Sequence, residues 1–466
     1  MICDFFYPNF GGVENHVYYL SQCLLQLGFR VLVVTHTYGA RQGVRWLQGG
    51  LKVYHLPFPP FLMQTTFPTL WMSLPFYYDL FLRERVDLVH GHSAFSTMCE
   101  EGILYARSMG IPCVFTDHSL FGFADVSSIL INKLLKFILS DVQRVICVSH
   151  TSRENTVLRA ALDPHRVHVI PNAILVEHFA PVSGPVSGPV SGLVSASTPT
   201  PTSTSTSTSM SMSTLLPHEL TVVVLSRLVH RKGTDLLLTL VPDICARFPH
   251  VRFVIAGDGP KRIDLEQMRE RHRLHERVSL LGAVRSEEVR SVLARGQVFL
   301  NTSLTEAFCM AIVEAAACNL FVVSTRVGGI PEVLPPDMLR LAAPTAPDLT
   351  RVLADVLQDY RAGRITHTPG FHARIAAMYS WQEVAARTAR LYRALATDPV
   401  DGCTAPPTPL LERLRRVWAA GPLAGKFLCI AVVWCHFYHR LLLWLLPPAT
   451  IPPAMGVRTR AHARIH

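Results

Sequence analysis

Short apolar runs alternate with longer amphipathic runs over most of the chain, which predicts strands that alternate with helices. In the first part, a helix is expected at 13–27, and strands at 5–12 (closing in a glycine turn), 30–35, 86–90, 113–116 and 144–149. In the second part, a helix is expected at 381–395, and strands at 220–226, 252–256, 278–281, 298–301 and 321–324. This alternation is typical of parallel, doubly wound sheets. We therefore expect an α/β fold of two Rossmann-like domains that face a cleft.

Two further segments depart from this alternation. Residues 181–217 are mostly Ser, Thr, Pro and Gly, which predicts a disordered linker or insertion. Residues 427–446 are an apolar run long enough to cross a bilayer, with a buried or interfacial helix as the alternative. The predicted order is an acceptor-side domain (1–180), the linker (181–217), a donor-nucleotide domain (218–395), a juxtamembrane segment (396–426), a transmembrane helix (427–446) and a short tail (447–466).

Composition narrows the class of partner. The net charge is +10, yet the chain has no block of basic residues and no aromatic RNA-binding pattern, which argues against nucleic acid. The positive charge suits a diphosphate or a phospholipid surface. Eleven scattered cysteines, none in a Cys-x-x-Cys pattern, indicate reduced thiols. The first residues lack the basic stretch of a signal peptide, so we expect the catalytic region to face the cytosol.

Two glutamates in the stretch 299–334 carry the clearest chemistry. Glu306 follows a predicted strand, and Glu314 lies in a helical run. Eight helical residues span about 12 Å, whereas a glycosidase acid–base pair is separated by about 5 to 9.5 Å. The two carboxylates therefore suit the ends of one elongated ligand, or else they are solvated residues of an ordinary amphipathic helix. Between them we expect a first helical turn with free N–H groups for an anion, formed by Ala307, Phe308, Cys309 and Met310.

A basic loop follows the first strand of the second domain. Arg227 and Lys232 lie in the sequence SRLVHRKG, and Arg231 is a less certain third cation. Ligands bind at the carboxyl ends of strands in such sheets, so these cations are predicted to bind a diphosphate. The alternative is a solvated basic turn. Because the chain contains no Asp-x-Asp pair, we expect no metal at the diphosphate.

Glycines in two turns permit close approach of a ligand to the backbone. Gly11 and Gly12 close the first predicted strand, and Gly257 opens the sequence GDGP. We interpret the Gly11–Gly12 turn as a loop beside the acceptor and donor, and Gly257 as part of the donor site. A plain turn is the alternative at each place.

Histidines follow two strands of the first domain. His118, in FTDHS, could contact the donor sugar across the cleft, or it could be a structural histidine bonded to backbone. His90 and His92 form an H-x-H pair, but no third metal ligand is visible in the sequence, so we predict no metal site.

These motifs together resemble the retaining GT-B glycosyltransferases. The resemblance rests on the glycine turn, TDHS, SRLVHRKG, GDGP, the two glutamates of E-x7-E, and GGIPE, and it covers residues 2–395 apart from the linker. Three longer stretches, DFFYPNFGGVENHVYYLSQCLLQLG, FTDHSLFGFADVSS and SLTEAFCMAIVEAA, are similar to the branch of this family that begins the synthesis of GPI anchors.

The resemblance implies transfer of N-acetylglucosamine from UDP-N-acetylglucosamine to phosphatidylinositol, with retention at the anomeric carbon and no cofactor. It implies that Glu306 holds sugar hydroxyls and Glu314 the ribose, with Arg227 and Lys232 on the diphosphate. It also implies a single-pass protein of the endoplasmic reticulum membrane, with the catalytic domain in the cytosol and other subunits as partners.

Departures from the family pattern concern small residues. Ala307 and Cys309 stand where glycine is usual, and small side chains still permit the tight turn. Asn319 replaces a further glycine and tolerates the left-handed conformation. Two other functions stay open: a related transferase, such as a mannosyltransferase with a lipid acceptor, and a catalytically silent subunit that only binds partners.

Overall fold

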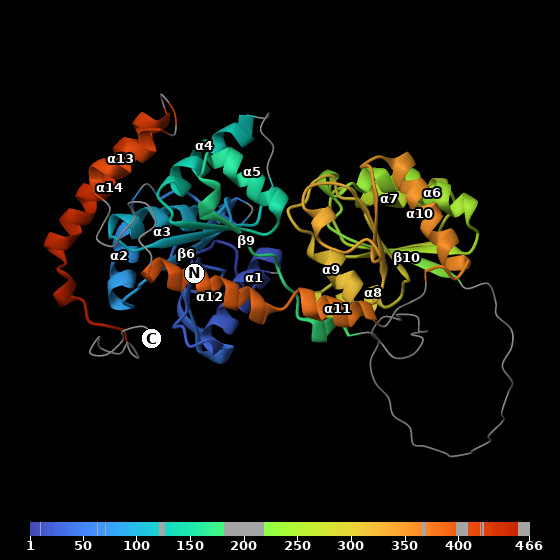
Figure 1. The fold of residues 1–466 in the computed structure, drawn as a ribbon, viewed down its shortest axis with the longest axis horizontal. Helices are drawn as coiled ribbons and strands as arrows, with labels where there is room; N and C mark the ends of the chain where they lie inside the picture. Colours follow the sequence, from blue (N-terminus) through green and yellow to red (C-terminus); the bar gives the residue numbers. More distant parts are fainter. Residues whose placement is uncertain are drawn as a thin grey trace, which may run out of the picture.

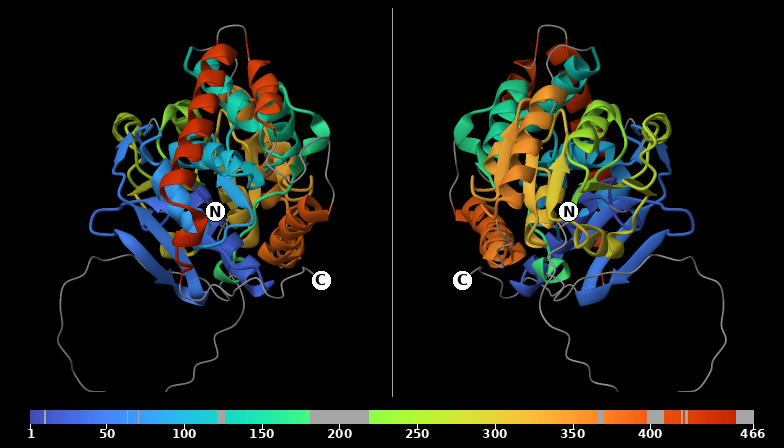
Figure 2. Two further views of the ribbon diagram at one scale, coloured as in Figure 1. Left: turned by 90° about the vertical axis from the view of Figure 1, so that its left-hand side faces the viewer. Right: turned by 90° about the vertical axis from the view of Figure 1, so that its right-hand side faces the viewer.

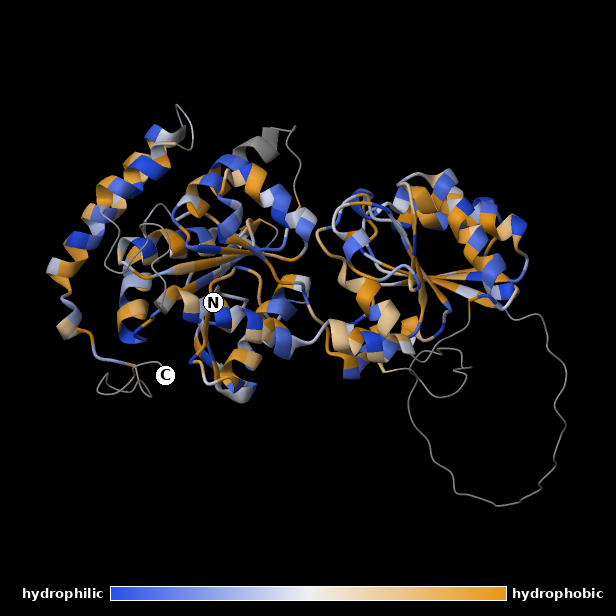
Figure 3. Ribbon diagram, in the orientation of Figure 1, coloured by the Kyte–Doolittle hydropathy of each residue, from blue (hydrophilic) through white to orange (hydrophobic). Residues whose placement is uncertain are grey.

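The computed structural model describes residues 1–9, 11–62, 64–69, 71–120, 126–180, 219–365, 370–397, 409–419, 421 and 424–454. Two α/β domains lie side by side, and a long C-terminal helix runs along the outer side of the first domain (Figures 1 and 2). Apolar residues concentrate along the central strands of both sheets (Figure 3). The predicted linker at 181–217 lies outside the described residues.

The first domain is built on one sheet. Its spatial order runs from an antiparallel edge strand through parallel strands: β2 (Gly43–Leu47), β3 (Leu51–Leu56), β1 (Leu32–His36), the single residue Ile2, β6 (Val89–His92), β7 (Cys113–Asp117), β8 (Arg144–Cys147) and β9 (Val167–Val169). The sheet is covered by α1 (Gly12–Gln26), α2 (Leu74–Arg83), α3 (Thr97–Ser108), α4 (Val126–Ser140) and α5 (His150–Ala160). A hairpin of β4 (Pro60–Leu62) and β5 (Thr65–Thr66) stands apart from the main sheet.

The strand expected at 5–12 is wrong. Among the described residues before α1, Ile2 alone pairs with the sheet, by single bridges to Val34 and Gly91. Beyond it, side chains take the backbone donors: the Asp4 amide bonds the Ser96 hydroxyl at 2.9 Å, and the Phe6 amide bonds the Tyr38 hydroxyl at 3.0 Å. A strand cannot extend where its donors are already satisfied by side chains. The other four predicted strands of this domain are confirmed, as is the helix at 13–27.

The second domain contains a six-stranded parallel sheet. Its order is β12 (Val278–Gly282), β11 (Val251–Ala256), β10 (Leu220–Leu225), β13 (Val298–Asn301), β14 (Phe321–Thr325) and β15 (Leu339–Ala342). All five predicted strands are present. The packed helices are α6 (Thr234–Arg247), α7 (Arg262–Arg271), α8 (Val289–Leu293), α9 (Met310–Ala317), α10 (Ala346–Arg361) and α11 (Gly370–Met378). The strand order reverses between β10 and β13, and such a switch point is where doubly wound sheets bind ligands.

Helix α12 (Trp381–Thr397) returns to the first domain, although it follows the second in sequence (Figure 1). It packs along α1, where Trp381 lies with its ring centre 5.4 Å from that of His16. The Tyr392 hydroxyl lies 2.5 Å from Nδ1 of His90. The first domain is therefore completed by a helix that sequence order assigns to the second.

The C-terminal region holds α13 (Leu410–Trp418) and α14 (Ala424–Leu445). Residues 425–445 of α14 are long and apolar enough to cross a membrane, in agreement with the predicted span. One face of α14 packs on α2, α3 and α4 and buries Val432, Cys435 and Leu442. The opposite face exposes large apolar side chains, including Phe427, Ile430, Trp434, Phe437, Leu441 and Trp444.

Candidate functional site

The switch point of the second sheet carries an ion pair. Lys232 lies in a 3-10 turn after β10, and its Nζ contacts Oε1 of Glu306, which follows β13. The hydroxyl of Ser303 donates to the same carboxylate oxygen at 3.0 Å. Both side chains are mostly buried, with 19% of Lys232 and 13% of Glu306 exposed. Two residues 74 positions apart thus meet because parallel neighbours end at one sheet edge.

Two glycines allow the loops around this pair to approach each other. Gly233 has φ +68°, and a β-carbon there would collide with the carbonyl oxygen of Thr302. Gly328 has φ +50°, and a β-carbon there would collide with the carbonyl oxygen of Glu306. Only glycine fits such positions, so both loops depend on it to hold Lys232 and Glu306 together.

Arg227 follows β10 and is exposed. Burial raises the pKa of Glu14, on α1 of the first domain, and the nearby charge of Arg227 partly opposes this rise. This electrostatic coupling places the Arg227 cation at the boundary between the domains. Gly257 follows β11, and its amide donates to the Gly282 carbonyl at 2.7 Å. It therefore lies at the carboxyl end of β11, the strand beside β10.

The first helical turn predicted at 307–310 is wrong. Helix α9 begins only at Met310, and Ala307, Phe308 and Cys309 precede it as buried loop residues. Cys309 has φ +73°, the left-handed conformation, which an α-helix does not accommodate. The Phe308 ring packs 5.5 Å from that of Tyr379. Any N-terminal N–H groups therefore come from Met310 onward.

Glu314 lies within α9 and is partly buried. Burial raises the pKa of this carboxyl to about 7. It therefore differs from Glu306, whose carboxylate is compensated by Lys232 and Ser303. The two glutamates occupy distinct environments rather than forming one acid–base pair.

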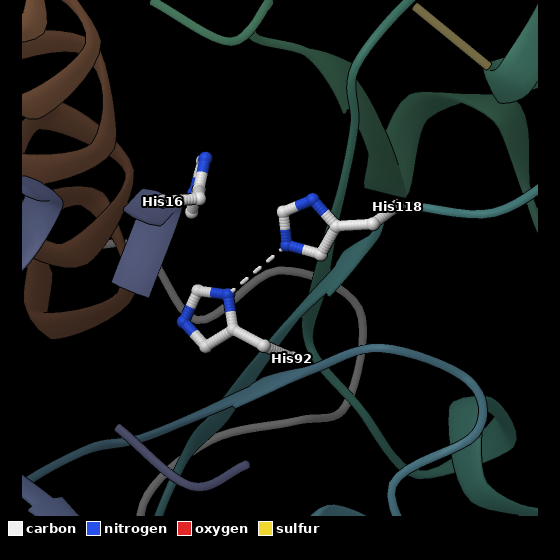
Figure 4. Close-up of side chains that lie close together, drawn as sticks. All are labelled: His16, His92 and His118. Atoms are coloured by element: carbon white, nitrogen blue, oxygen red, sulfur yellow. Dashed lines mark hydrogen bonds between the residues drawn. The ribbon is translucent and has the colours of Figure 1, made fainter. Parts of the chain in front are cut away.

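Three histidines meet at the carboxyl edge of the first sheet (Figure 4). His92 ends β6, His118 follows β7, and His16 comes from α1. Nδ1 of His92 lies 3.4 Å from Nε2 of His118, and the His16 ring centre lies 4.6 Å from that of His118. Burial lowers the pKa of all three rings, to about 4 for His118. The group is therefore neutral at physiological pH.

His90 and His92 of the H-x-H pair make different contacts. The His90 ring bonds the hydroxyls of Tyr392 and Thr116, which fixes α12 to the sheet. His92 instead joins His16 and His118, and one nitrogen from each of these three rings lies within 4.8 Å of the others. His16, the third member of this group, comes from α1 and was not indicated by the sequence.

Gly11 and Gly12 open α1 beside this group. Gly11 has extended backbone, and a β-carbon there would collide with the carboxylate of Glu14. Around Gly12 no atom lies within 4 Å of where a β-carbon would stand. The turn is therefore narrow at Gly11 and open at Gly12.

The GGIPE segment joins the two domains. Oxygens of Glu332 accept from the backbone amides of His150 and Thr151, at 2.6 and 2.8 Å, at the start of α5. A carboxylate at a helix N-terminus is favoured by the helix dipole. These two hydrogen bonds tie the start of α5, in the first domain, to the second domain.

Two family models match the chain, one in each domain. The model described as PIGA (GPI anchor biosynthesis) matches residues 36–125, and the model described as glycosyl transferases group 1 matches residues 219–359. A phosphatidylinositol N-acetylglucosaminyltransferase subunit of Arabidopsis thaliana is 50% identical over 98% of this chain and 94% of its own length. The chain belongs to this family of transferase subunits.

Other comparisons agree with this membership. The corresponding transferase subunit of Homo sapiens is 46% identical over 98% of this chain and 87% of its own length. Among solved structures, sucrose-phosphate synthase from Thermosynechococcus elongatus superposes with a TM-score of 0.64 at 20% identity, covering 83% of this chain and 94% of that chain. The chain is a glycosyltransferase with the GT-B fold, as predicted.

The predicted residues fall into two groups within this family fold. Lys232 and Glu306 are in contact, while His118 lies on the other domain beside His92 and His16. The latter two were not predicted for the site. The one available signal for His16 was its place on the first turns of the helix after Gly12.

Proposed function

We propose that this chain transfers N-acetylglucosamine from UDP-N-acetylglucosamine to phosphatidylinositol, with retention, as the first step of GPI-anchor synthesis. The observation that supports this most directly is the Lys232–Glu306 pair at the switch point of the second sheet. It combines a cation for a diphosphate with a carboxylate for sugar hydroxyls at one strand edge. Membership of the transferase family supplies the donor and the acceptor.

The roles follow from charge and position. Lys232 and Arg227 neutralise the diphosphate as the bond to the sugar breaks, so no metal is required. Glu306 accepts hydrogen bonds from sugar hydroxyls, and Glu314 accepts from the ribose. Neutral His118 lies by the sugar without adding a positive charge near the reacting carbon. The departing phosphate takes the proton of the attacking inositol hydroxyl on the same face, which retains the configuration.

The setting is the endoplasmic reticulum membrane, with both domains on the cytosolic side and α14 as the anchor. The relatives are named as subunits of a transferase, so this chain works within a multi-subunit complex. An apolar helix that follows the two domains fits such a setting.

The test is an assay in microsomes from cells that lack the endogenous transferase. Expression of this chain with its partner subunits should yield labelled N-acetylglucosaminyl-phosphatidylinositol from UDP-N-acetylglucosamine. GDP-mannose in place of that donor should give no labelled phosphatidylinositol product. A mannosyl-phosphatidylinositol that depends on this chain, or no product from either donor, would refute the proposal.

A further inference from the structure

A surface segment of the first domain lacks charge altogether. From Leu56 to Tyr78 the chain contains no Asp, Glu, Lys, Arg or His. Five of its large apolar side chains are nonetheless exposed, here called the apolar edge: Phe61 (72% exposed), Leu62 (63%), Phe67 (61%), Met72 (76%) and Phe76 (44%). Single exposed apolar residues are ordinary, but a contiguous group marks an interaction surface.

The apolar edge is held in place by buried polar contacts. The Thr66 amide donates to Oδ1 of Asp4 at 2.8 Å, and Oδ2 of the same buried carboxylate accepts from Ser96 at 2.7 Å. The ring of His36, at the end of β1, lies 3.0 Å from the Gln64 carbonyl oxygen. These contacts fix the β4–β5 hairpin to strand ends of the first sheet. That same sheet edge carries His118.

Trp71, next to Met72 of the apolar edge, lies beside α14. The Trp71 ring centre lies 6.1 Å from that of Trp434, on the outward face of α14. Helix α14 also packs on α2, which begins at Leu74 within this segment and carries Phe76 of the apolar edge. Two regions far apart in sequence therefore form one apolar surface, and the second of them has the length and composition of a membrane helix.

We propose that the apolar edge docks into the interfacial layer of a phospholipid bilayer beside α14. Aromatic and aliphatic side chains enter this layer readily, and the absence of charge from 56 to 78 removes the main cost of doing so. A protein partner usually meets an apolar centre surrounded by a polar rim, and this segment contributes no charged residue to such a rim. The docking turns the carboxyl edge of the first sheet toward the lipid. That it presents the acceptor headgroup to His118 rests on the proposed function.

The direct test is depth-dependent fluorescence on the full chain. A Leu62→Cys variant labelled with an environment-sensitive dye is placed in phosphatidylcholine–phosphatidylinositol nanodiscs that contain a spin-labelled quencher lipid. We expect a blue shift and strong quenching of the dye at position 62. The matched control is Leu158→Cys on α5, which is 70% exposed and should stay unquenched. The parent chain, labelled in parallel, gives the background of the native cysteines.

Two results would overturn the proposal. One is equal or absent quenching at the two positions. The other is a dye at position 62 that is shielded only when partner subunits are added, which would assign the surface to a protein. Because this readout needs no transfer, it remains decisive even if the chain proves to have another activity.

A second test separates docking from folding. In Phe67→Glu, transfer to phosphatidylinositol in vesicles should fall about tenfold, while transfer to a water-soluble short-chain phosphatidylinositol should change less than about twofold. Leu158→Glu should alter neither rate. An equal loss with both acceptors would show that the residue supports the fold and not the membrane contact.

Discussion

The candidate site residues of the two domains differ in charge. On the second domain, Lys232 and Glu306 are charged and compensate each other at the switch point. On the first domain, His16 and His92 are buried and His118 lies half-buried beside them, and burial lowers the pKa of all three. A charged side suits the diphosphate of a nucleotide sugar, and a neutral side suits the sugar and the reacting carbon. Under the proposed function, the second domain binds the diphosphate and the first domain orients the sugar.

We expect the largest effect from removing the cation of the Lys232–Glu306 pair. Lys232→Ala should lower kcat/KM by about 10³-fold, because the diphosphate loses its cation and the mostly buried Glu306 keeps the Ser303 hydrogen bond but has no opposing charge. Transfer from UDP-N-acetylglucosamine in microsomes measures this. The matched control is Lys261→Ala, which removes the exposed ion pairs with Asp235 and Asp264 and should stay within about twofold of the parent. A Lys232→Ala enzyme within tenfold of the parent would contradict the diphosphate role.

The next effect concerns the neutral side. His118→Gln should lower kcat by about 10²-fold, because the sugar loses a positioned neighbour. Since burial lowers the pKa of His118 to about 4, the ring is already neutral above pH 5. The parent enzyme should therefore show no change in kcat from this residue between pH 6 and 8. If kcat of the parent changed with a titration near pH 6.5, and this change were absent in His118→Gln, the histidine would act as a charged group.

A smaller effect distinguishes the two glutamates. Burial raises the pKa of Glu314 to about 7, so its carboxylate is lost as the pH falls through that value. The KM for the donor should rise about tenfold from pH 8 to pH 6, since only the ionised form accepts from both ribose hydroxyls. Glu314→Gln should make this KM independent of pH. A pH-dependent KM in the variant would place the titrating group elsewhere.

The smallest effect tests the loop before α9. Cys309 holds φ +73°, a conformation that costs a non-glycine residue about 1 kcal/mol. Cys309→Gly relieves this strain but loses a buried side chain, so Tm should change by only a few degrees. The transfer rate should stay within about twofold of the parent. A loss beyond tenfold would mean that the thiol itself contacts the donor.

The meeting of the basic loop and Glu306 in the second domain could be largely predicted because both motifs are local. Arg227 follows one strand and Glu306 another, and strand ends of a parallel sheet converge whatever the details of packing. The helix start was misplaced because Cys309 looks like a helical residue in sequence, while its left-handed backbone is imposed by the loop. The strand at 5–12 failed for a similar reason, since the distant Tyr38 hydroxyl takes the Phe6 amide, as the Ser96 hydroxyl takes the Asp4 amide just before it.

The first-domain site could not be predicted to the same extent. His16, His92 and His118 meet only after α1 docks against the ends of β6 and β7. The pairing of His90 with Tyr392 requires α12 to cross between domains, which nothing in the sequence signals. The apolar edge is equally hard to predict, because a charge-free run usually belongs to a core.

By itself, the sequence determined the alternation of strands and helices, the Arg/Lys loop and the two glutamates, and the apolar C-terminal run. These follow from periodicity and residue chemistry, which act over a few neighbouring positions. The tertiary structure alone decided which histidines meet, which domain carries the neutral group, and that the apolar edge faces outward near α14. Such properties depend on burial and on contacts between segments hundreds of residues apart, and neither is encoded in a local pattern.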